Sequence, residues 1–263
     1  HIDYITLQAV NPDKRRYIIE NEAPRHYIDL DVYGAYKDSL KFLSWKQAIE
    51  KFTEDTLMAH GIVPWYISFL TGHLTDAFRE KDAKRILKIS ADIGHYIGDA
   101  HVPLHTTRNY NGQLTNQHGI HSFWESRLPE LFFEEYDFFV GKASYVANID
   151  SIIWQAVYKT HNAVDSVLSI EKSLNDVWPS DKKYAFEERG NMMVKVYARA
   201  YSAEYHKRLS GQVERQMRAA VKLLGDIIFT CWVNAGSPSI EDQELQFEDT
   251  HEHDVDEIYD CNH

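Results

Sequence analysis

Two pairs of metal-binding side chains, each spaced by four residues, constrain the fold of this chain more than any other feature. His95 is followed by Asp99, and His121 is followed by Glu125. On a helix this spacing places both side chains on one face, with Cβ atoms about 6 Å apart, so each pair could chelate one ion. His105 lies between the pairs and offers a further imidazole. Imidazole and carboxylate ligands without cysteine are typical of zinc sites that keep a position open for water.

A single pair of this kind is usually an exposed capping or charge pair, because such short motifs arise easily by chance. Two pairs that flank a third histidine within one short stretch are much harder to explain in that way. The competing histidines nearby are His73, His101 and His118. His101 has no carboxylate four residues further on, and His118 has Ser122 there. We therefore expect both to lie outside the ligand set.

The composition predicts a packed globular protein. Of 263 residues, 44% are hydrophobic and 13% aromatic, which is not the composition of a disordered chain. We expect one domain over residues 1–236, since no linker rich in Pro, Gly or Ser divides it, followed by an acidic, flexible tail over residues 237–263. No apolar run reaches the roughly 18 residues that a membrane helix requires. Cys231 and Cys261 are too few for a disulfide framework.

The net charge of -12 is concentrated in the predicted tail, where residues 241–263 include ten acidic residues and no Lys or Arg. The remaining body is nearly neutral. It lacks the basic stripe that dominates the affinity of proteins for nucleic acids, although aromatic side chains could still form a groove for a single strand.

Apolar residues recur at helical spacing through most of the chain and predict an all-α fold with almost no strands. Gly61 and Pro64 are expected to end the first long helix, and Pro103 the third. Residues 11–34 lack this periodicity and are expected to be mostly loop. The predicted helices span residues 44–62, 65–82, 83–102, 121–136, 144–176, 186–210 and 213–234. Apolar positions of the later helices that are expected to fill the core include Met192, Met193, Tyr197 and Tyr201.

Asp13 and His26 lie in the aperiodic segment, with the carboxylates of Asp29 and Asp31 nearby. By themselves such residues are usually turn formers, since an Asp side chain bonds readily to its local backbone. The chain begins at His1 without an initiator Met or a visible signal peptide, and we expect the sequence to begin inside a longer precursor.

Three segments resemble the zinc-dependent phospholipase C family, which shares its all-helical fold with the fungal and plant zinc single-strand nucleases. Residues 95–105, HYIGDAHVPLH, resemble the family's H-Y-x-G-D-x-x-x-P-x-H signature. Residues 121–125, HSFWE, resemble its H-S-x-x-E, and residues 24–31, PRHYIDLD, resemble the segment that holds another histidine ligand. The similarity covers most of residues 1–235 and implies a single multi-helix domain of this type, from a bacterial member of the family.

The resemblance implies two zinc ions, the first bound by Asp13, His26, His95 and Asp99 and the second by His105, His121 and Glu125. Family members bind a third zinc through their N-terminal amine and carbonyl, usually of a Trp, and through a nearby histidine, with the aspartate that matches Asp99 bridging it to the first ion. This chain has no Trp at its start and no second histidine in its first twelve residues. The third ion is therefore expected only if a native N-terminal segment is present.

The resemblance further implies a phosphodiester hydrolase with a zinc-activated hydroxide, because coordination lowers the pKa of water from about 15.7 towards about 7. Asp13 is expected to orient or deprotonate this water, and Asp99 to be the catalytic carboxylate shared between ions. A phospholipid substrate is favoured, since the family's nucleases usually have Asp where this chain has Glu125. A secreted or periplasmic protein in transient contact with a membrane surface is implied.

Two other functions stay open. The same zinc site could serve a single-strand nuclease or 3'-nucleotidase, or a non-catalytic helical module that zinc stabilises. A di-iron carboxylate bundle is disfavoured, because that architecture uses Glu-x-x-His pairs at i,i+3. The substrate cleft is expected to be formed by the polar loop over residues 106–119 and by the aromatic residues Trp65, Phe123 and Trp124.

Overall fold

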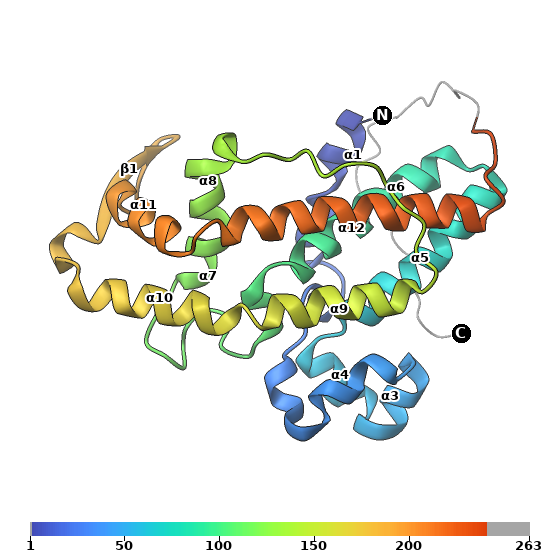
Figure 1. Ribbon diagram of the computed structural model, residues 1–263, viewed down its shortest axis with the longest axis horizontal. Helices are drawn as coiled ribbons and strands as arrows, with labels where there is room; N and C mark the ends of the chain where they lie inside the picture. The colour runs from blue at the N-terminus through green and yellow to red at the C-terminus, as the bar shows by residue number, and fades with distance from the viewer. Residues whose placement is uncertain (1, 241–263) are drawn as a thin grey trace.

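The chain is described over residues 2–240 by a computed structural model, which confirms the predicted all-α class (Figure 1). Within that range the strands form a single two-stranded sheet. None of the helices in residues 2–240 combines the length and the apolar character needed to cross a membrane. The predicted flexible tail, apart from residues 237–240, lies outside the described residues, as does Cys261. Cys231 is buried and forms no disulfide within residues 2–240.

The described elements run in the following order, where η denotes a 3₁₀-helix except for η4, which is a π-helix. The first half contains α1 (Ile2–Gln8), α2 (Asn11–Arg15), η1 (Ala23–His26), η2 (Leu30–Phe42), α3 (Trp45–Phe52), α4 (Glu54–His60), α5 (Val63–Glu80), α6 (Ala83–Ala100) and η3 (Pro103–Thr106). The second half contains α7 (Ile120–Ser122), η4 (Phe123–Arg127), α8 (Leu128–Phe132), η5 (Phe133–Glu135), α9 (Ile149–His161), α10 (Val164–Val177), η6 (Ser180–Lys182), β1 (Tyr184–Arg189), β2 (Met192–Tyr197), α11 (Arg199–Arg208) and α12 (Gln212–Asn234).

Helix α6, which carries the first ligand pair, forms where its local signals predict. Asp82 caps its N-terminus, since the carboxylate Oδ1 accepts a hydrogen bond from the backbone N–H of Arg85 at 3.0 Å. Ile86 and Ile93 belong to its buried face, which packs against α5 and α12. The helix ends at Ala100, shortly before Pro103. The prediction of a helix over residues 83–102 is thus confirmed to within two residues.

The hydrophobic core consists of two clusters of buried side chains. Helix α12 contributes residues to both. The first is built mainly from α5, α6, α9 and the C-terminal part of α12. The second is built from α7, η4, α10, α11 and β2, with Val213 of α12. In Figure 1, α9 and α10 follow each other end to end, and α12 runs in roughly the same direction in this view. Ile97 belongs to the first cluster and Leu104 to the second, so the segment with the metal-binding signature passes from one core to the other.

The predicted helix over residues 186–210 is wrong in its first half, which forms a β-hairpin. Strands β1 and β2 pair antiparallel, with Arg189 opposite Met192, and Gly190 in the turn has a φ of 61° that suits glycine. The strand residues include β-branched and aromatic side chains that favour extended structure. Met192 and Met193 are 69% and 64% exposed, so the prediction that they fill the core is also wrong.

Tyr197 and Tyr201, which follow on from the hairpin, are buried as predicted. Other helix boundaries differ because side-chain caps interrupt the apolar periodicity. Thr53, at a φ of 67°, separates α3 from α4 and caps α4 by accepting from the Thr56 N–H. Asn148 caps α9 in the same way, so the helix predicted from residue 144 begins at Ile149.

Residues 11–34, predicted to be mostly loop, contain α2, η1 and the start of η2. These short turns are stabilised by contacts with distant residues. The Ile62 N–H donates to the Pro24 carbonyl at 2.8 Å, and the Val63 N–H donates to the Tyr27 carbonyl at 3.2 Å. Gly61 lies so close to Tyr27 that a Cβ there would be 2.2 Å from the Tyr27 carbonyl oxygen. The start of α5 therefore positions the segment that carries His26.

Candidate metal centre

The first group of predicted ligands brings three separate segments together. Asp13 comes from α2, His26 from η1, and His95 and Asp99 from consecutive turns of α6. The His26 Nδ1 lies 2.8 Å from Asp99 Oδ2 and 3.1 Å from His95 Nε2. Asp13 Oδ1 lies 4.0 Å from His26 Nδ1 and 3.9 Å from His95 Nε2. Four potential ligand side chains therefore converge, although Asp99 lies 73 positions from His26 in the sequence.

The second group comes from the segment that follows α6. His105 lies in η3, His121 in α7 and Glu125 in η4. The His121 Nε2 is 2.7 Å from Glu125 Oε2 and 3.1 Å from His105 Nε2, and His105 Nε2 is 3.5 Å from Glu125 Oε2. The π-helical turn η4 locally widens the helix that bears Glu125. Such turns are rare and occur frequently at functional sites.

Backbone pairing holds the two groups next to each other. His105 Nδ1 is 2.6 Å from the His26 carbonyl oxygen, a distance at which the ring N–H donates to it. The Ile28 N–H donates to the His105 carbonyl at 2.9 Å. This arrangement leaves His105 Nε2 as the nitrogen that faces the second group. It also fixes the position of His105, a predicted ligand of one group, directly against His26, a predicted ligand of the other.

The donor atoms fit the ligand chemistry of zinc. In each group three side chains offer atoms that lie within 4.8 Å of one another: Asp13, His26 and His95, and then His105, His121 and Glu125. Asp99 adds a second carboxylate to the first group. In both groups two imidazole nitrogens approach to 3.1 Å, so their lone pairs converge on one small volume. Histidine nitrogen with carboxylate oxygen is the donor set of catalytic zinc sites, which bind through three protein ligands and an open position.

The groups are strongly coupled by charge in the metal-free protein. Burial acts to raise the pKa of Asp99, but the charge of His105 and hydrogen bonds from His26 and His95 outweigh it and hold that pKa well below its usual range. Burial acts to lower the pKa of His105, but the charge of Asp99 and the hydrogen bond to Glu125 raise it to about 9. The influence of Asp99 on His105 shows that the two groups share one electrostatic environment.

In the second group, the pKa of the Glu125 carboxylate is lowered, whereas that of His105 is raised. Burial acts to raise the pKa of Glu125, yet hydrogen bonds from His105 and His121 lower it to about 2. For His26, burial acts to lower the pKa, but the hydrogen bond with Asp99 and the nearby negative charge of Glu22 raise it. In each group a carboxylate thus favours its charged form, and a neighbouring histidine holds its proton more strongly than usual.

The metal-free protein is expected to lose stability as the pH rises from 6.5 to about 9. Protonated His105 has a folded pKa of about 9 against an ordinary value of 6.5, so its contribution is complete below 6.5 and lost as the pH rises through 9. One pKa unit corresponds to about 1.4 kcal/mol, so this contribution is at most about 3.5 kcal/mol. Glu125, with a pKa lowered from 4.5 to about 2, contributes above 4.5 and loses its contribution towards pH 2.

Thermal unfolding at a series of pH values in the presence of chelator measures this profile. The zinc-loaded protein serves as the control, because a metal-bound imidazole has already lost its proton and should show no loss between pH 6.5 and 9. A flat profile for the metal-free protein over that range would contradict the proposed charge coupling.

The aromatic residues predicted to line the cleft lie elsewhere. Phe123 and Trp124 are buried in the second core. Trp65 is buried too and lines a different cavity of about 930 Å³, together with Phe42, Trp45 and Trp154. The prediction for these three residues is therefore wrong, because their size and apolar character are used in packing.

Three residues near the groups were missed in the sequence. Tyr110, in the polar loop, places its ring 6.2 Å from that of His121. Arg16 NH1 lies 3.2 Å from Asp13 Oδ1. Glu22 is fully buried against His26. It precedes that histidine by four residues, the same spacing as in the pairs His95/Asp99 and His121/Glu125. This spacing could have indicated Glu22 in the sequence. His101 and His118 belong to neither group: His101 is buried against the Ile97 carbonyl, and His118 is exposed.

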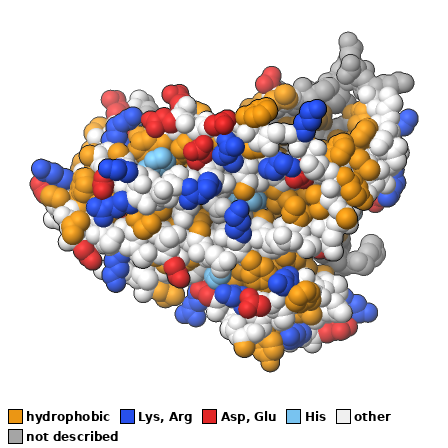
Figure 2. Space-filling model, viewed as in Figure 1, with side chains coloured by type: hydrophobic (Ala, Val, Ile, Leu, Met, Phe, Trp, Pro, Cys, Tyr) orange, Lys and Arg blue, Asp and Glu red, His pale blue; other side chains and the backbone are white. Residues whose placement is uncertain are grey.

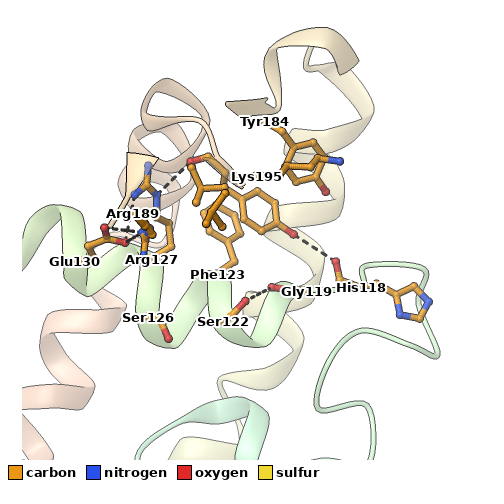
Figure 3. A pocket seen from close by; sticks show the side chains of 13 residues that line it. His118, Gly119, Ser122, Phe123, Ser126, Arg127, Glu130, Tyr184, Arg189 and Lys195 are labelled. Atoms are coloured by element: carbon orange, nitrogen blue, oxygen red, sulfur yellow. Dashed lines mark hydrogen bonds and ion pairs between the residues drawn. The ribbon is translucent and has the colours of Figure 1, made fainter. Parts of the chain in front are cut away.

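A further cavity of about 390 Å³ lies between η4 and the hairpin (Figure 3). Its lining includes Ser122 and Ser126 but none of the seven predicted ligands. Its arginines are already paired, Arg127 with Glu130 at 3.2 Å and Arg189 with Glu130 at 2.6 Å. The charged side chains of this cavity therefore serve to attach the hairpin to the helix.

No protein family and no curated protein matches this chain. The arguments for its function therefore rest on the two ligand groups and their surroundings.

Proposed function

We propose that the chain is a zinc-dependent hydrolase of phosphodiesters. The observation that carries the proposal is the convergence of seven nitrogen and carboxylate ligand residues into two adjacent groups, linked by the hydrogen bond from His105 to the His26 carbonyl. A single structural zinc site would not require two such groups. Zinc ions bound there would supply a nucleophilic hydroxide at neutral pH and positive charge for the phosphate oxygens.

The side chains of the centre have distinct roles in this proposal. Asp13 is the most exposed ligand, with 58% of its side chain accessible, whereas His26 and Asp99 are buried. Asp13 can therefore reach an incoming water and orient it or accept its proton. His26, Asp99 and His105 hold fixed positions, which matters because a catalytic group must be positioned before the substrate binds.

A phospholipid is the substrate class that we favour. Acidic and basic side chains are interspersed on the face drawn in Figure 2, which gives no support to binding of a long polyanion. Large apolar side chains are exposed close to ligand residues in sequence: Tyr17 and Ile18 follow Asp13, and Tyr110 and Leu114 precede His121. Apolar side chains of this kind favour contact with a lipid surface.

Tyr110 also supports the second candidate, a single-strand nuclease or 3'-nucleotidase. Its ring is half exposed beside His121, and an aromatic ring in that position can stack on a nucleobase, which is worth about 1 to 3 kcal/mol per base. A non-catalytic module stabilised by zinc is the third candidate. It predicts metal binding without turnover of any phosphodiester.

A panel of substrates at matched zinc and salt concentrations tests the proposal. Short-chain phosphatidylcholine, single-stranded DNA, RNA and nucleoside 3'-monophosphates are each incubated with zinc-loaded protein and with chelated protein. We expect zinc-dependent release of phosphocholine and diacylglycerol. Turnover of single-stranded nucleic acid alone would support the nuclease, and a zinc-loaded protein without activity on any of these substrates would support the non-catalytic module.

A further inference from the structure

The two nitrogens of the His26 ring lie in different surroundings. Nδ1 faces the first ligand group, 2.8 Å from Asp99 Oδ2 and 3.1 Å from His95 Nε2. Nε2 is buried and has no hydrogen-bond partner among residues 2–240, and Glu22 Oε1 lies 3.7 Å from it. A neutral histidine that binds an ion through Nδ1 must carry its proton on Nε2. This buried N–H requires an acceptor on its own side of the ring, and Glu22 is the carboxylate on that side.

Glu22 is held firmly in this position. It is fully buried, Arg25 NH1 lies 2.6 Å from its Oε2, and the Tyr96 hydroxyl donates to its Oε1. Arg15 Nε lies 3.6 Å from the same Oε1. Two arginines and a hydroxyl thus lie around the carboxylate, which favours its charged form although it is buried.

Helix α6 supports both the ligands and the surroundings of Glu22. Tyr96, which donates to Glu22, directly follows the ligand His95 in sequence. Asp92, one turn earlier, accepts a hydrogen bond from Arg15 NH1 at 3.2 Å. Arg15 NH2 also donates to the Tyr96 hydroxyl at 3.2 Å. One face of this helix therefore carries the predicted ligands His95 and Asp99. Tyr96, on an adjoining face, holds Glu22 in place.

The second group orients its histidine in a comparable way. His105 donates from Nδ1 to the His26 carbonyl, which leaves Nε2 to face His121 and Glu125. Histidines that bind metals almost always donate their other ring N–H to a carboxylate or a carbonyl, and this partner fixes both the tautomer and the direction of the ring. A backbone carbonyl has this role for His105, and the corresponding position beside His26 is occupied by Glu22.

We propose that Glu22 is a positioning residue of the first metal group: its carboxylate accepts the His26 Nε2 proton and so keeps Nδ1 unprotonated and directed at the ion. The inference rests on the proposed metal centre but not on the identity of the substrate. It explains why a fully buried carboxylate that belongs to neither ligand group is placed between two arginines and a tyrosine beside His26.

Glu22→Gln tests the inference through metal affinity rather than activity. Glutamine keeps the shape of the side chain but replaces a charged acceptor by an amide. We expect the affinity for one of the two zinc ions, measured by competition with a chromophoric chelator, to fall roughly 10- to 100-fold, with the other unchanged. The visible spectrum of the cobalt-substituted protein should change for the same single ion.

Glu171→Gln is the matched control. Glu171 is also a buried carboxylate with several partners, including Tyr201 and Lys183, but it contacts no ligand residue. Its replacement should lower thermal stability and leave both zinc affinities within about twofold. Equal weakening of zinc binding by the two substitutions would show that Glu22 acts only through general stability and would overturn the inference.

Tyr96→Phe provides an independent variant that leaves the carboxylate in place and removes only the hydroxyl that holds it. A several-fold loss of affinity for the same ion is expected, and this variant decides the question if Glu22→Gln does not fold. Unchanged zinc affinity in the folded variants would overturn the inference. Wild-type protein that binds two zinc ions but hydrolyses no phosphodiester would reject the proposed function and leave the role of Glu22 standing.

Discussion

Replacing Asp99 with asparagine is expected to lower the phosphodiesterase activity of the zinc-loaded protein at least about 100-fold. Loss of a residue that merely supports a metal ligand costs about 10- to 100-fold, and Asp99 is itself a predicted ligand. Its Oδ2 lies 2.8 Å from His26 Nδ1 and 3.3 Å from His95 Nε2, and its charge also raises the pKa of His105. Asparagine keeps the shape but removes the charge that both groups share.

Initial rates at saturating zinc, on whichever substrate the wild type turns over, measure the effect. Asp226→Asn is the matched control, because Asp226 is a buried aspartate of α12 that accepts from the Ser144 N–H and from Lys222. It should lose stability but keep its activity within about twofold. His118→Ala, at an exposed position outside both groups, should also leave the activity nearly unchanged. An Asp99→Asn variant as active as these two would refute the assignment of Asp99 as a ligand.

Zinc loading is expected to raise the melting temperature of the protein by roughly 10 °C or more. The ligands come from separate segments that approach only in the folded chain, so metal binding is coupled to folding. A ligand at 1,000 times its dissociation constant stabilises the native state by about 4 kcal/mol per site, and for a chain of this size each kcal/mol shifts the melting temperature by about 2 to 4 °C.

Elemental analysis of protein purified without chelator should find two zinc ions per chain, and chelator should reverse the thermal shift. Glu125→Gln is a useful comparison, because it alters only the second group and should leave one ion tightly bound. Less than one zinc per chain together with no thermal response to chelator would rule out the centre as described.

The sequence by itself determined the all-α class and the two i,i+4 pairs. Helix α6 could be predicted because its signals are local: a capping Asp82, a repeating apolar face and a proline just beyond its end. Helix α12 was likewise predicted to within one residue at its start. Once α6 is helical, the proximity of His95 to Asp99 follows from the geometry of the helix alone.

The hairpin over residues 184–197 could not be predicted from local pattern in this way. Its residues mix apolar and charged side chains, so helical and extended periodicity compete over a short range. Strand β1 is stabilised by pairing with β2 and by Arg127, whose guanidinium forms an ion pair with Glu187. Such distant partners are not visible in a window of neighbouring residues.

Only the tertiary structure decided that Asp13, His26 and Glu22 belong with the central signature. Residues 11–34 carry no periodic signal, and the resemblance to a family supplied the expectation for Asp13 and His26. In the fold, the Ile28 N–H donates to the His105 carbonyl, and the Pro24 carbonyl accepts from the Ile62 N–H. These bonds bring the segment against α6. The physical reason is that helices are encoded by neighbours in sequence, whereas a metal centre is assembled by packing and backbone pairing between residues that are far apart in the chain.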